Sequence, residues 1–437
     1  MRMITKDISL EDCILDLIDN CLDGAHKARQ VRGSAESVDY RGFRAQVELS
    51  GERFRIVDNC GGITIAEAID YAFHFGRRLD APPEGEYSIG LYGIGMKRAL
   101  FKIGNKIEIY SSTDKEAFRT KIDVKDWLTR APTMAPGETV LKEDWDFDME
   151  DAEVNPETGT SIEIGELYTP ISKQFANAEF ANSVARIVAR DYAQFLAKGF
   201  EISINGKKIE AFRFTVAESD DFKPIRTDYV DESGVNVEII AGMAGRPPDD
   251  LQPTERRMET EYYGWFVICN DRVVVASDTT NRTVWGDGDF PNWHFQYNGF
   301  IGVVLFTSKD PNLLPWTTTK RDVDRSNATY RRAIEKMKDV TRLWIKYTND
   351  RKANIAVAKD REASASAKPL FTVERNSTLQ VPRLSRTAEL VSYTWIQYKK
   401  PSSEVAKVKK MLRNSSMPNY RVGEMTFDYY VKSESED

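Results

Sequence analysis

The chain has 437 residues, 41% of them hydrophobic, and a net charge of −7 at pH 7. This length allows two or three domains with ordinary cores, and no run of about 18 apolar residues is present to form a membrane-spanning helix. The N-terminus MRMITKDISLEDC carries charges where a secretion signal needs an apolar core. Four cysteines without a CxxC pair and three scattered histidines give no motif for a zinc site or a histidine-based triad. We therefore expect a cytoplasmic protein with reduced thiols and no membrane partner.

The charge is distributed unevenly along the chain. Between Lys320 and Arg421, 24 Lys and Arg stand against 10 Asp and Glu, which leaves +14 in this stretch and −21 in the remainder. One interpretation is a solvated helix face, because RRAIEKMKDVTRLWIKYTNDRKA has the apolar spacing of an amphipathic helix. The other is an electrostatic footprint for DNA or for an acidic partner protein. Both interpretations stay open at this point.

The first third of the chain reads as a helix, a hairpin and a second helix. Ser9 is a helix cap, Asp12 stands at the third helical position, and apolar residues then recur at helical spacing. The alternation in AQVELSGERFRIVDN predicts two strands around a turn at Ser50 and Gly51. Residues 63–75 have a helical pattern, and the loop APPEGEYS follows them.

The remainder of the chain alternates paired strands with helices. Strands are predicted in NKIEIYSST, TGTSIEIGEL, GWFVICNDRVVV and FIGVVLFT, and Asn205-Gly206 predicts a tight hairpin. The segment EFANSVARIVARDYAQFLAKG predicts one amphipathic helix that ends at Gly199, and residues 328–352 predict a long helix. The composition of REASASAKP predicts a linker. Because no regular βαβ alternation is present, the sequence predicts an α+β fold and not a doubly wound parallel sheet.

The first helix carries a polar stripe on one face. Asp16, Asn20 and Asp23 stand at i, i+4 and i+7, which places them together and away from the apolar positions. The stripe is either a solvated face or a set of hard oxygen ligands suited to Mg²⁺ and a bound water. Further along, Asp58 ends a strand before Gly61 and Gly62, where a flat ligand can approach the backbone and a carboxylate can accept hydrogen bonds from an amine.

A glycine triplet precedes the next helix. Gly90, Gly93 and Gly95 in GLYGIGMK lead directly into a helix that carries Lys97. Alone, the triplet is either a phosphate-binding loop at a helix N-terminus or a flexible turn. Thr160 then stands at the beginning of a strand with its hydroxyl available for an inward hydrogen bond.

Four motifs in this order, DLIDNCLDGA, DNCGGI, GLYGIGMK and TGTSIEIGELYTPI, resemble the GHKL ATPases, which include gyrase, the ninety-kilodalton heat-shock chaperones, histidine kinases and MutL. The glycine motif most resembles the MORC ATPases and their bacterial relatives. The resemblance implies a Bergerat-type ATPase sandwich, a mixed sheet covered by helices, at residues 1–168. LLPWTTTKRDVD resembles a loop of the transducer domain of gyrase and MutL, which implies a transducer-like α/β domain at 169–350. Residues 351–437 are expected to be a linker and a small basic C-terminal region.

The resemblance also implies roles for individual residues. Asp16 would position the attacking water, Asn20 would hold Mg²⁺, and Lys320 would contact the γ-phosphate of ATP. The other residues implied to bind ATP are Asp23, Asp58, Gly62, Ile63, Gly90, Gly93, Gly95, Lys97 and Thr160. ATP would close a lid between about residues 77 and 88 and bring two protomers together, and family analogy points to a DNA-transaction or phage-defence partner.

Two departures from the family pattern bear on this interpretation. Asp16 stands where the family usually has a glutamate, one methylene longer, so hydrolysis is expected to be slow. The alternative is a nucleotide-gated scaffold that binds ATP with little turnover. Cys60 replaces the first glycine of the adenine-binding turn, which the backbone tolerates if the φ angle of Cys60 stays negative.

Overall fold

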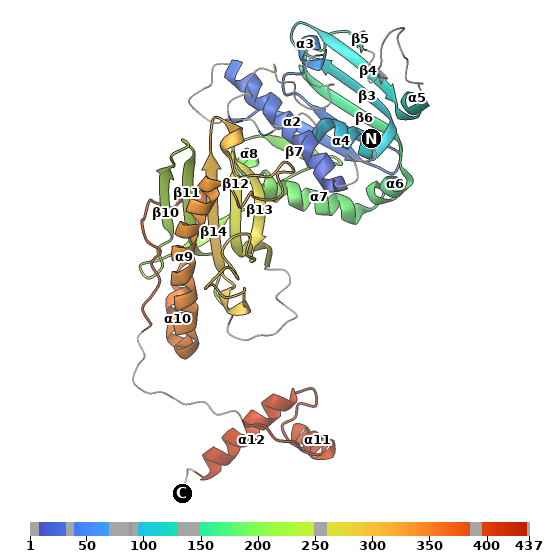
Figure 1. The fold of residues 1–437 in the computed structure, drawn as a ribbon. Coiled ribbons are helices and arrows are strands. Elements are labelled where there is room, and N and C mark those ends of the chain that lie inside the picture. The colour runs from blue at the N-terminus through green and yellow to red at the C-terminus, as the bar shows by residue number, and fades with distance from the viewer. Residues whose placement is uncertain are drawn as a thin grey trace. The chain divides into compact units, whose positions relative to one another are not determined.

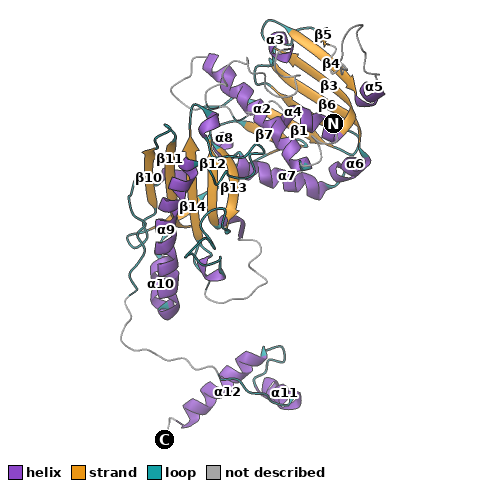
Figure 2. Cartoon of the chain, viewed as in Figure 1, coloured by secondary structure: helices purple, strands orange, loops and turns teal. Residues whose placement is uncertain are grey.

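The computed structural model describes residues 8–31, 39–69, 87, 89, 95–129, 149–248, 260–384 and 396–434. The chain divides into two compact units, Met1–Leu384 and Ser385–Asp437. The first unit holds two mixed β-sheets with helices packed against them, so the fold is α+β as the sequence predicts (Figures 1 and 2). The domain limits expected at residues 168 and 350 stay predictions.

The first sheet has eight strands among the described residues, in the order β5-β4-β3-β6-β2-β1-β7-β8. β1 and β7 are parallel, and the other neighbours are antiparallel. Its strands are β1 (Arg44–Leu49), β2 (Phe54–Asp58), β3 (Gly104–Ser112), β4 (Ala117–Asp123), β5 (Met149–Asp151), β6 (Gly159–Leu167), β7 (Glu201–Ile204) and β8 (Lys207–Lys208). Both predicted hairpins, β1–β2 and β7–β8, are confirmed.

Helices α2 (Leu10–Val31) and α4 (Gly95–Ile103) pack on each other and on this sheet (Figure 1). The predicted cap is confirmed, since Ser9 Oγ accepts a hydrogen bond from the backbone N–H of Asp12 at 3.0 Å. The apolar stripe of α2 is buried. Residues forming this stripe are Ile14, Leu15, Ile18, Leu22 and Ala25. Two further helices of the unit are α5 (Val124–Thr129) and α6 (Thr169–Phe175).

One predicted helix is divided in the structure, and another is described only in part. The single helix predicted to end at Gly199 is divided into α7 (Ala178–Asp191) and α8 (Ala193–Ala197), because Tyr192 leaves the helical conformation at φ −110° and ψ 18°. The hydroxyl of Tyr192 donates to the carbonyl of Leu15 on α2 at 2.9 Å, so a tertiary contact accompanies the break. Of the helix predicted over 63–75, the structure describes α3 (Ile65–Glu67), and residues 70–75 lie outside the described residues.

The second sheet has the order β13-β12-β14-β11-β9-β15, and β10 pairs with β11. β12 and β14 are parallel, whereas the other pairs are antiparallel. Its strands are β9 (Thr215–Glu218), β10 (Ile225–Val230), β11 (Asn236–Met243), β12 (Gly264–Cys269), β13 (Arg272–Asp278), β14 (Phe300–Thr307) and β15 (Ser366–Pro369). The predicted long helix is confirmed as α9 (Ala328–Ala353), which packs on β11 and β14. Short 3-10 turns lie at Thr260–Tyr262, Phe295–Tyr297, Pro311–Leu313 and Leu370–Thr372.

The linker prediction for REASASAKP is wrong. Helix α10 (Ile355–Ala363) covers its first three residues, and β15 covers Ser366–Pro369. β15 pairs antiparallel with β9, from Ser366 opposite Glu218 to Pro369 opposite Thr215. An edge strand is held by backbone hydrogen bonds, which small polar residues provide as well as large apolar ones. A composition typical of linkers therefore does not exclude a strand at this edge.

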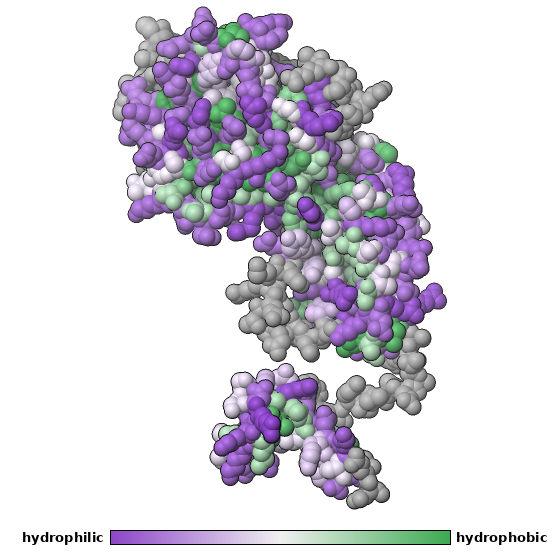
Figure 3. All heavy atoms as spheres, turned by 180° about the vertical axis from the view of Figure 1, so that it is seen from behind, coloured by the Kyte–Doolittle hydropathy of each residue, from purple (hydrophilic) through white to green (hydrophobic). Residues whose placement is uncertain are grey.

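The C-terminal unit contains two helices. They are α11 (Ser402–Met411) and α12 (Asn419–Glu434). Val422 is buried, but many apolar side chains of this unit are exposed, and hydrophobic atoms reach its surface in Figure 3. The exposed set comprises Ile396, Tyr398, Met411, Tyr420, Met425, Phe427, Tyr429, Tyr430 and Val431. Across the described part of the chain, no helix combines the length and the apolar content needed to cross a membrane.

Candidate active site

Asp58 stands at the end of β2 with its carboxylate held in place by backbone donors. Its Oδ1 accepts hydrogen bonds from the N–H groups of Cys60 at 2.8 Å and Thr160 at 3.3 Å. Burial raises the pKa of Asp58, while these hydrogen bonds lower it, and the pKa lies above its ordinary value. Oδ2 accepts from the weak thiol donor of Cys21 at 3.4 Å, and the thiol of Cys60 is also close to this carboxylate. A stronger donor, such as an exocyclic amine, therefore fits this oxygen.

The turn after Asp58 requires glycine at two positions, because a side chain there would overlap the neighbouring backbone. Gly62 has a φ of +73°, and a Cβ there would overlap the carbonyl oxygen of Ser112. A Cβ on Gly159 would overlap the carbonyl oxygen of Asp58. Cys60 has no positive φ and is buried, so it replaces a glycine without strain. These close approaches join the turn to β3 and β6.

Side chains of β3 and β6 complete this end of the site. Ser111 Oγ accepts a hydrogen bond from the backbone N–H of Ile63 at 2.7 Å. The same hydroxyl lies 3.0 Å from Oγ1 of Thr160. The structure thus brings Thr160 beside Asp58, Gly62 and Ile63, although Thr160 follows Asp58 by 102 positions in the sequence.

The polar stripe of α2 faces the beginning of α4. Asp16 is only 7% exposed, and its Oδ2 lies 3.3 Å from a guanidinium nitrogen of Arg98. A Cβ on Gly95 would lie 2.9 Å from the same Oδ2, so the first residue of α4 touches the carboxylate. Asn20 is exposed, and Asp23 Oδ1 accepts from the N–H of Ile89 at 2.7 Å. Gly90 and Gly93 lie outside the described residues.

Burial raises the pKa of Asp16 above its ordinary value. The neighbouring Lys320 and Arg98 oppose this shift because positive charges favour the ionised carboxylate, whereas Asp19 adds to it. A carboxylate with a raised pKa accepts a proton more readily near neutral pH than an ordinary aspartate does. On α4, Lys97 is fully buried, and burial lowers the pKa of its ammonium to about 8. The role predicted for Lys97 stays a prediction.

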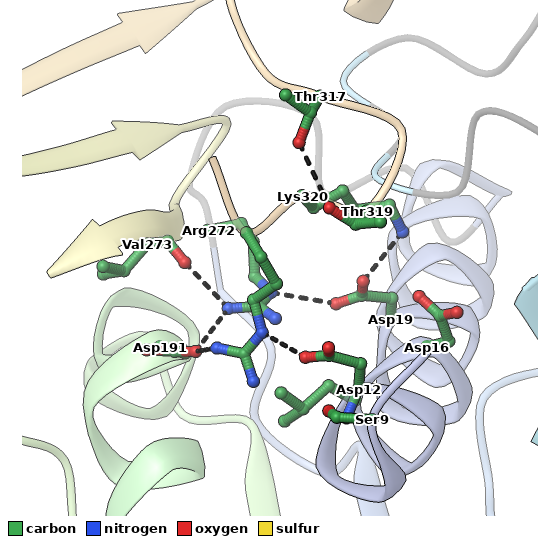
Figure 4. A network of polar contacts seen from close by, with 12 residues as sticks. Ser9, Asp12, Asp16, Asp19, Asp191, Arg272, Val273, Thr317, Thr319 and Lys320 are labelled. Carbon is green, nitrogen blue, oxygen red and sulfur yellow. Dashed lines mark hydrogen bonds and ion pairs between the residues drawn. The ribbon is translucent and has the colours of Figure 1, made fainter. Parts of the chain in front are cut away.

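Lys320 reaches the same helix from a loop of the second half of the unit. A bridge between Trp316 and Val323 closes the loop, and the N–H of Lys320 donates to the carbonyl of Thr317 at 2.9 Å. Lys320 has a φ of +53° and is 6% exposed. Its Nζ donates to Oδ2 of Asp19 at 2.8 Å (Figure 4). The fold therefore brings Lys320 and the stripe of α2 together across 301 sequence positions.

Sequence reasoning missed the residues that surround this contact. Asp19 Oδ1 accepts from the hydroxyl of Tyr192 at 2.7 Å and from Nε of Arg272 at 3.1 Å. Arg272 also pairs with Asp191 at 3.0 Å (Figure 4). Arg321 pairs with the same Asp191 at 2.6 Å and with Asp12. The sequence DLIDN could have indicated Asp19, because this aspartate directly precedes Asn20 and lies next to the polar stripe of α2.

The donor set fits ATP with magnesium. Mg²⁺ usually keeps several waters and takes one or two protein oxygens besides those of phosphates. The exposed amide of Asn20 supplies an oxygen of this type. In the parts of the chain that the structure describes, no group of three or more His, Cys, Asp or Glu side chains gathers to hold a metal.

Residues 8–143 match a family model described as histidine kinase-, DNA gyrase B-, and HSP90-like ATPase. The matched segment contains Asp16, Asn20, Asp58 and the glycine triplet, and it ends before Thr160 and Lys320. No curated protein matches the chain.

We predict that Asp58→Asn lowers ATP affinity by about 10- to 100-fold, because hydrogen bonds to a charged group contribute about 1.5–3 kcal/mol. Isothermal titration with ATP and GTP measures the effect. Cys21→Ala is the control, since it removes the thiol beside Oδ2 but leaves the carboxylate in place. Wild-type protein that binds GTP as tightly as ATP would contradict the assignment of Asp58 to adenine.

Proposed function

We propose that this protein binds Mg-ATP and hydrolyses it slowly. The observation that carries the proposal is the convergence of three distant segments around Asp16 and its neighbour Asp19 on α2. Asp16 on α2 touches Gly95 at the N-terminus of α4, and Lys320 lies beside it on Asp19. A helix N-terminus and a lysine both favour a phosphate, and a carboxylate between them can orient a water. The family model over residues 8–143 agrees with this chemistry.

The residues of the chain have separable tasks in this reaction. Asp16 orients a water toward the γ-phosphate and accepts its proton, for which its raised pKa suits it. Lys320 and the N-terminus of α4 stabilise the negative charge that develops on the phosphate oxygens. Asn20 would hold Mg²⁺, which neutralises part of the phosphate charge when bound. Asp58 and Thr160 recognise adenine, and Ile63 packs on the base.

The output of the reaction is conformational in our proposal. ATP closes the lid at about residues 77–88 and joins two copies of the chain, as the likeness to MORC and MutL ATPases suggests. Residues 169–350 act as the transducer, because the loop that carries Lys320 belongs to them. The basic C-terminal region contacts DNA or a partner protein in a DNA transaction or in phage defence. We place the protein in the cytoplasm.

We expect Asp16→Asn to lower the rate of phosphate release by about 100-fold or more, since general base catalysis contributes about 10²–10⁴-fold. The wild-type rate should fall on the acid side as Asp16 is protonated, at a higher pH than for an ordinary aspartate, because its pKa is raised. Asp16→Glu should retain turnover. Glu11→Gln, on the first turn of α2, is the control and should keep the wild-type rate.

The same assay decides between hydrolysis and the scaffold alternative. If the wild type binds ATP but releases phosphate no faster than Asp16→Asn, the protein is a nucleotide-gated scaffold.

Asn20→Ala should abolish the dependence of ATP binding on Mg²⁺ while leaving the fold intact, because Asn20 is exposed on α2. Titration of ATP with Mg²⁺ or with chelator measures this dependence, and circular dichroism checks the fold. Asn20→Asp keeps an oxygen ligand and should preserve the dependence. An Asn20→Ala variant that binds Mg-ATP like the wild type removes Asn20 from the site.

If the basic region contacts DNA, affinity for a labelled duplex should fall steeply with salt because bound phosphates release counterions. Charge reversal at Lys407, Lys409 and Lys410 on α11 should flatten this dependence. The matched control is charge reversal at Lys121, Lys173 and Lys207, which are exposed and lie outside the basic stretch. Absence of binding with and without an ATP analogue would leave a partner protein as the ligand.

A further inference from the structure

We propose that Asp19 is the positioning residue for Lys320. Its carboxylate holds the lysine ammonium beside Asp16 and leaves further N–H donors of the ammonium for the terminal phosphate of ATP. The inference rests on the proposed function and adds a residue that neither the motifs nor the family match assigns.

The contact itself is short and buried. Nζ of Lys320 donates to Oδ2 of Asp19 at 2.8 Å, and Asp19 is 1% exposed. An ammonium has three N–H donors. No second hydrogen bond of this ammonium is found among the described residues, so Asp19 fixes the position of Nζ and leaves donors for a ligand. A lysine with a positive φ is uncommon, and such backbone conformations persist where the surroundings determine them.

Asp19 is itself held from the opposite side. Its Oδ1 accepts from Tyr192, between α7 and α8, and from Arg272, at the beginning of β13. Arg272 is fixed in turn by Asp191 and by the carbonyl of Val273 (Figure 4). Because all these groups are almost fully buried, water cannot replace a lost partner. The position of Lys320 therefore depends on residues remote from the nucleotide.

Loss of the Asp19 charge changes the titration of Lys320 in any case, but this change reaches kcat only if the ammonium of Lys320 acts on the phosphate. Burial lowers the pKa of Lys320, and the carboxylates of Asp19 and Asp16, with a smaller effect of Asp23, raise it above its ordinary value. The other charged or titratable groups around the pair are Arg98, Asp191, Tyr192, Arg272 and Arg321. Without the charge of Asp19, the lysine loses its proton at a lower pH.

The test compares Asp19→Asn with the wild type in phosphate release from about pH 6 to about pH 10, the range that covers a perturbed amine. We expect kcat to fall by about tenfold or more near neutral pH, since misplacement of a catalytic group by about 1 Å can cost about 100-fold. Affinity for ADP should change by less than about threefold. The kcat of the variant should also decline at a lower alkaline pH than that of the wild type.

Two further variants sharpen the test. Combining Asp19→Asn with Lys320→Arg should remove the alkaline decline, because a guanidinium does not titrate in this range. Glu11→Gln, which neutralises an acidic residue on the first turn of the same helix, should show the wild-type profile. If Asp19→Asn does not fold, Tyr192→Phe removes the hydroxyl that contacts Asp19 and the carbonyl of Leu15. Because this variant keeps the charge of Asp19, kcat should fall by a smaller factor and the alkaline decline should stay where it is in the wild type.

The outcomes separate this inference from the proposed function. A wild-type pH profile and kcat in Asp19→Asn, or equal losses of kcat and ADP affinity, would overturn the positioning role alone. If the wild type binds ATP without turnover, the test measures the ratio of the affinity for a non-hydrolysable ATP analogue to the affinity for ADP in place of kcat. An unchanged ratio in Asp19→Asn then overturns the inference. A wild type that binds no nucleotide overturns both.

Discussion

The salt bridge between Lys320 and Asp19 joins a loop that follows the second sheet to the helix that carries the polar stripe. Taking two charges out of water costs several kcal/mol, which their mutual attraction offsets only when further hydrogen bonds satisfy them. Tyr192 and Arg272 supply those hydrogen bonds to Asp19. The break between α7 and α8, the beginning of β13 and the loop at 317–322 are therefore all tied to one carboxylate on α2.

This arrangement couples the two halves of the first unit. Helix α2 presents Asp16 toward the beginning of α4, and it presents Asp19 toward Arg272 and Lys320. A displacement of β13 or of the loop against α2 changes the distance between the ammonium and the carboxylate of Asp16. Conversely, a phosphate that binds the ammonium acts on the second sheet through a chain of buried contacts. A contiguous chain of buried contacts of this kind can couple two distant sites.

At the other end of the site, around Asp58, the geometry depends on the close approach of backbone segments. Gly62 and Gly159 leave room where a side chain would overlap a carbonyl oxygen, and this brings the turn after Asp58 against β3 and β6. Cys60 is compatible with the turn because the two residues that need a positive φ are Gly61 and Gly62. The departure from the family pattern at Cys60 therefore leaves the turn intact.

The sequence by itself determined the α+β class, the cap at Ser9, both hairpins and α9, because periodicity, caps and turns act over a few residues. It also indicated Asp16, Asn20 and Asp58 through motifs that are local. Only the tertiary structure decided the surroundings of Asp19, since Arg272 and Lys320 stand 253 and 301 positions away and their burial leaves no local pattern. For the same reason the strand at Ser366–Pro369 escaped prediction, because backbone pairing with β9 and not side-chain periodicity holds it in the sheet.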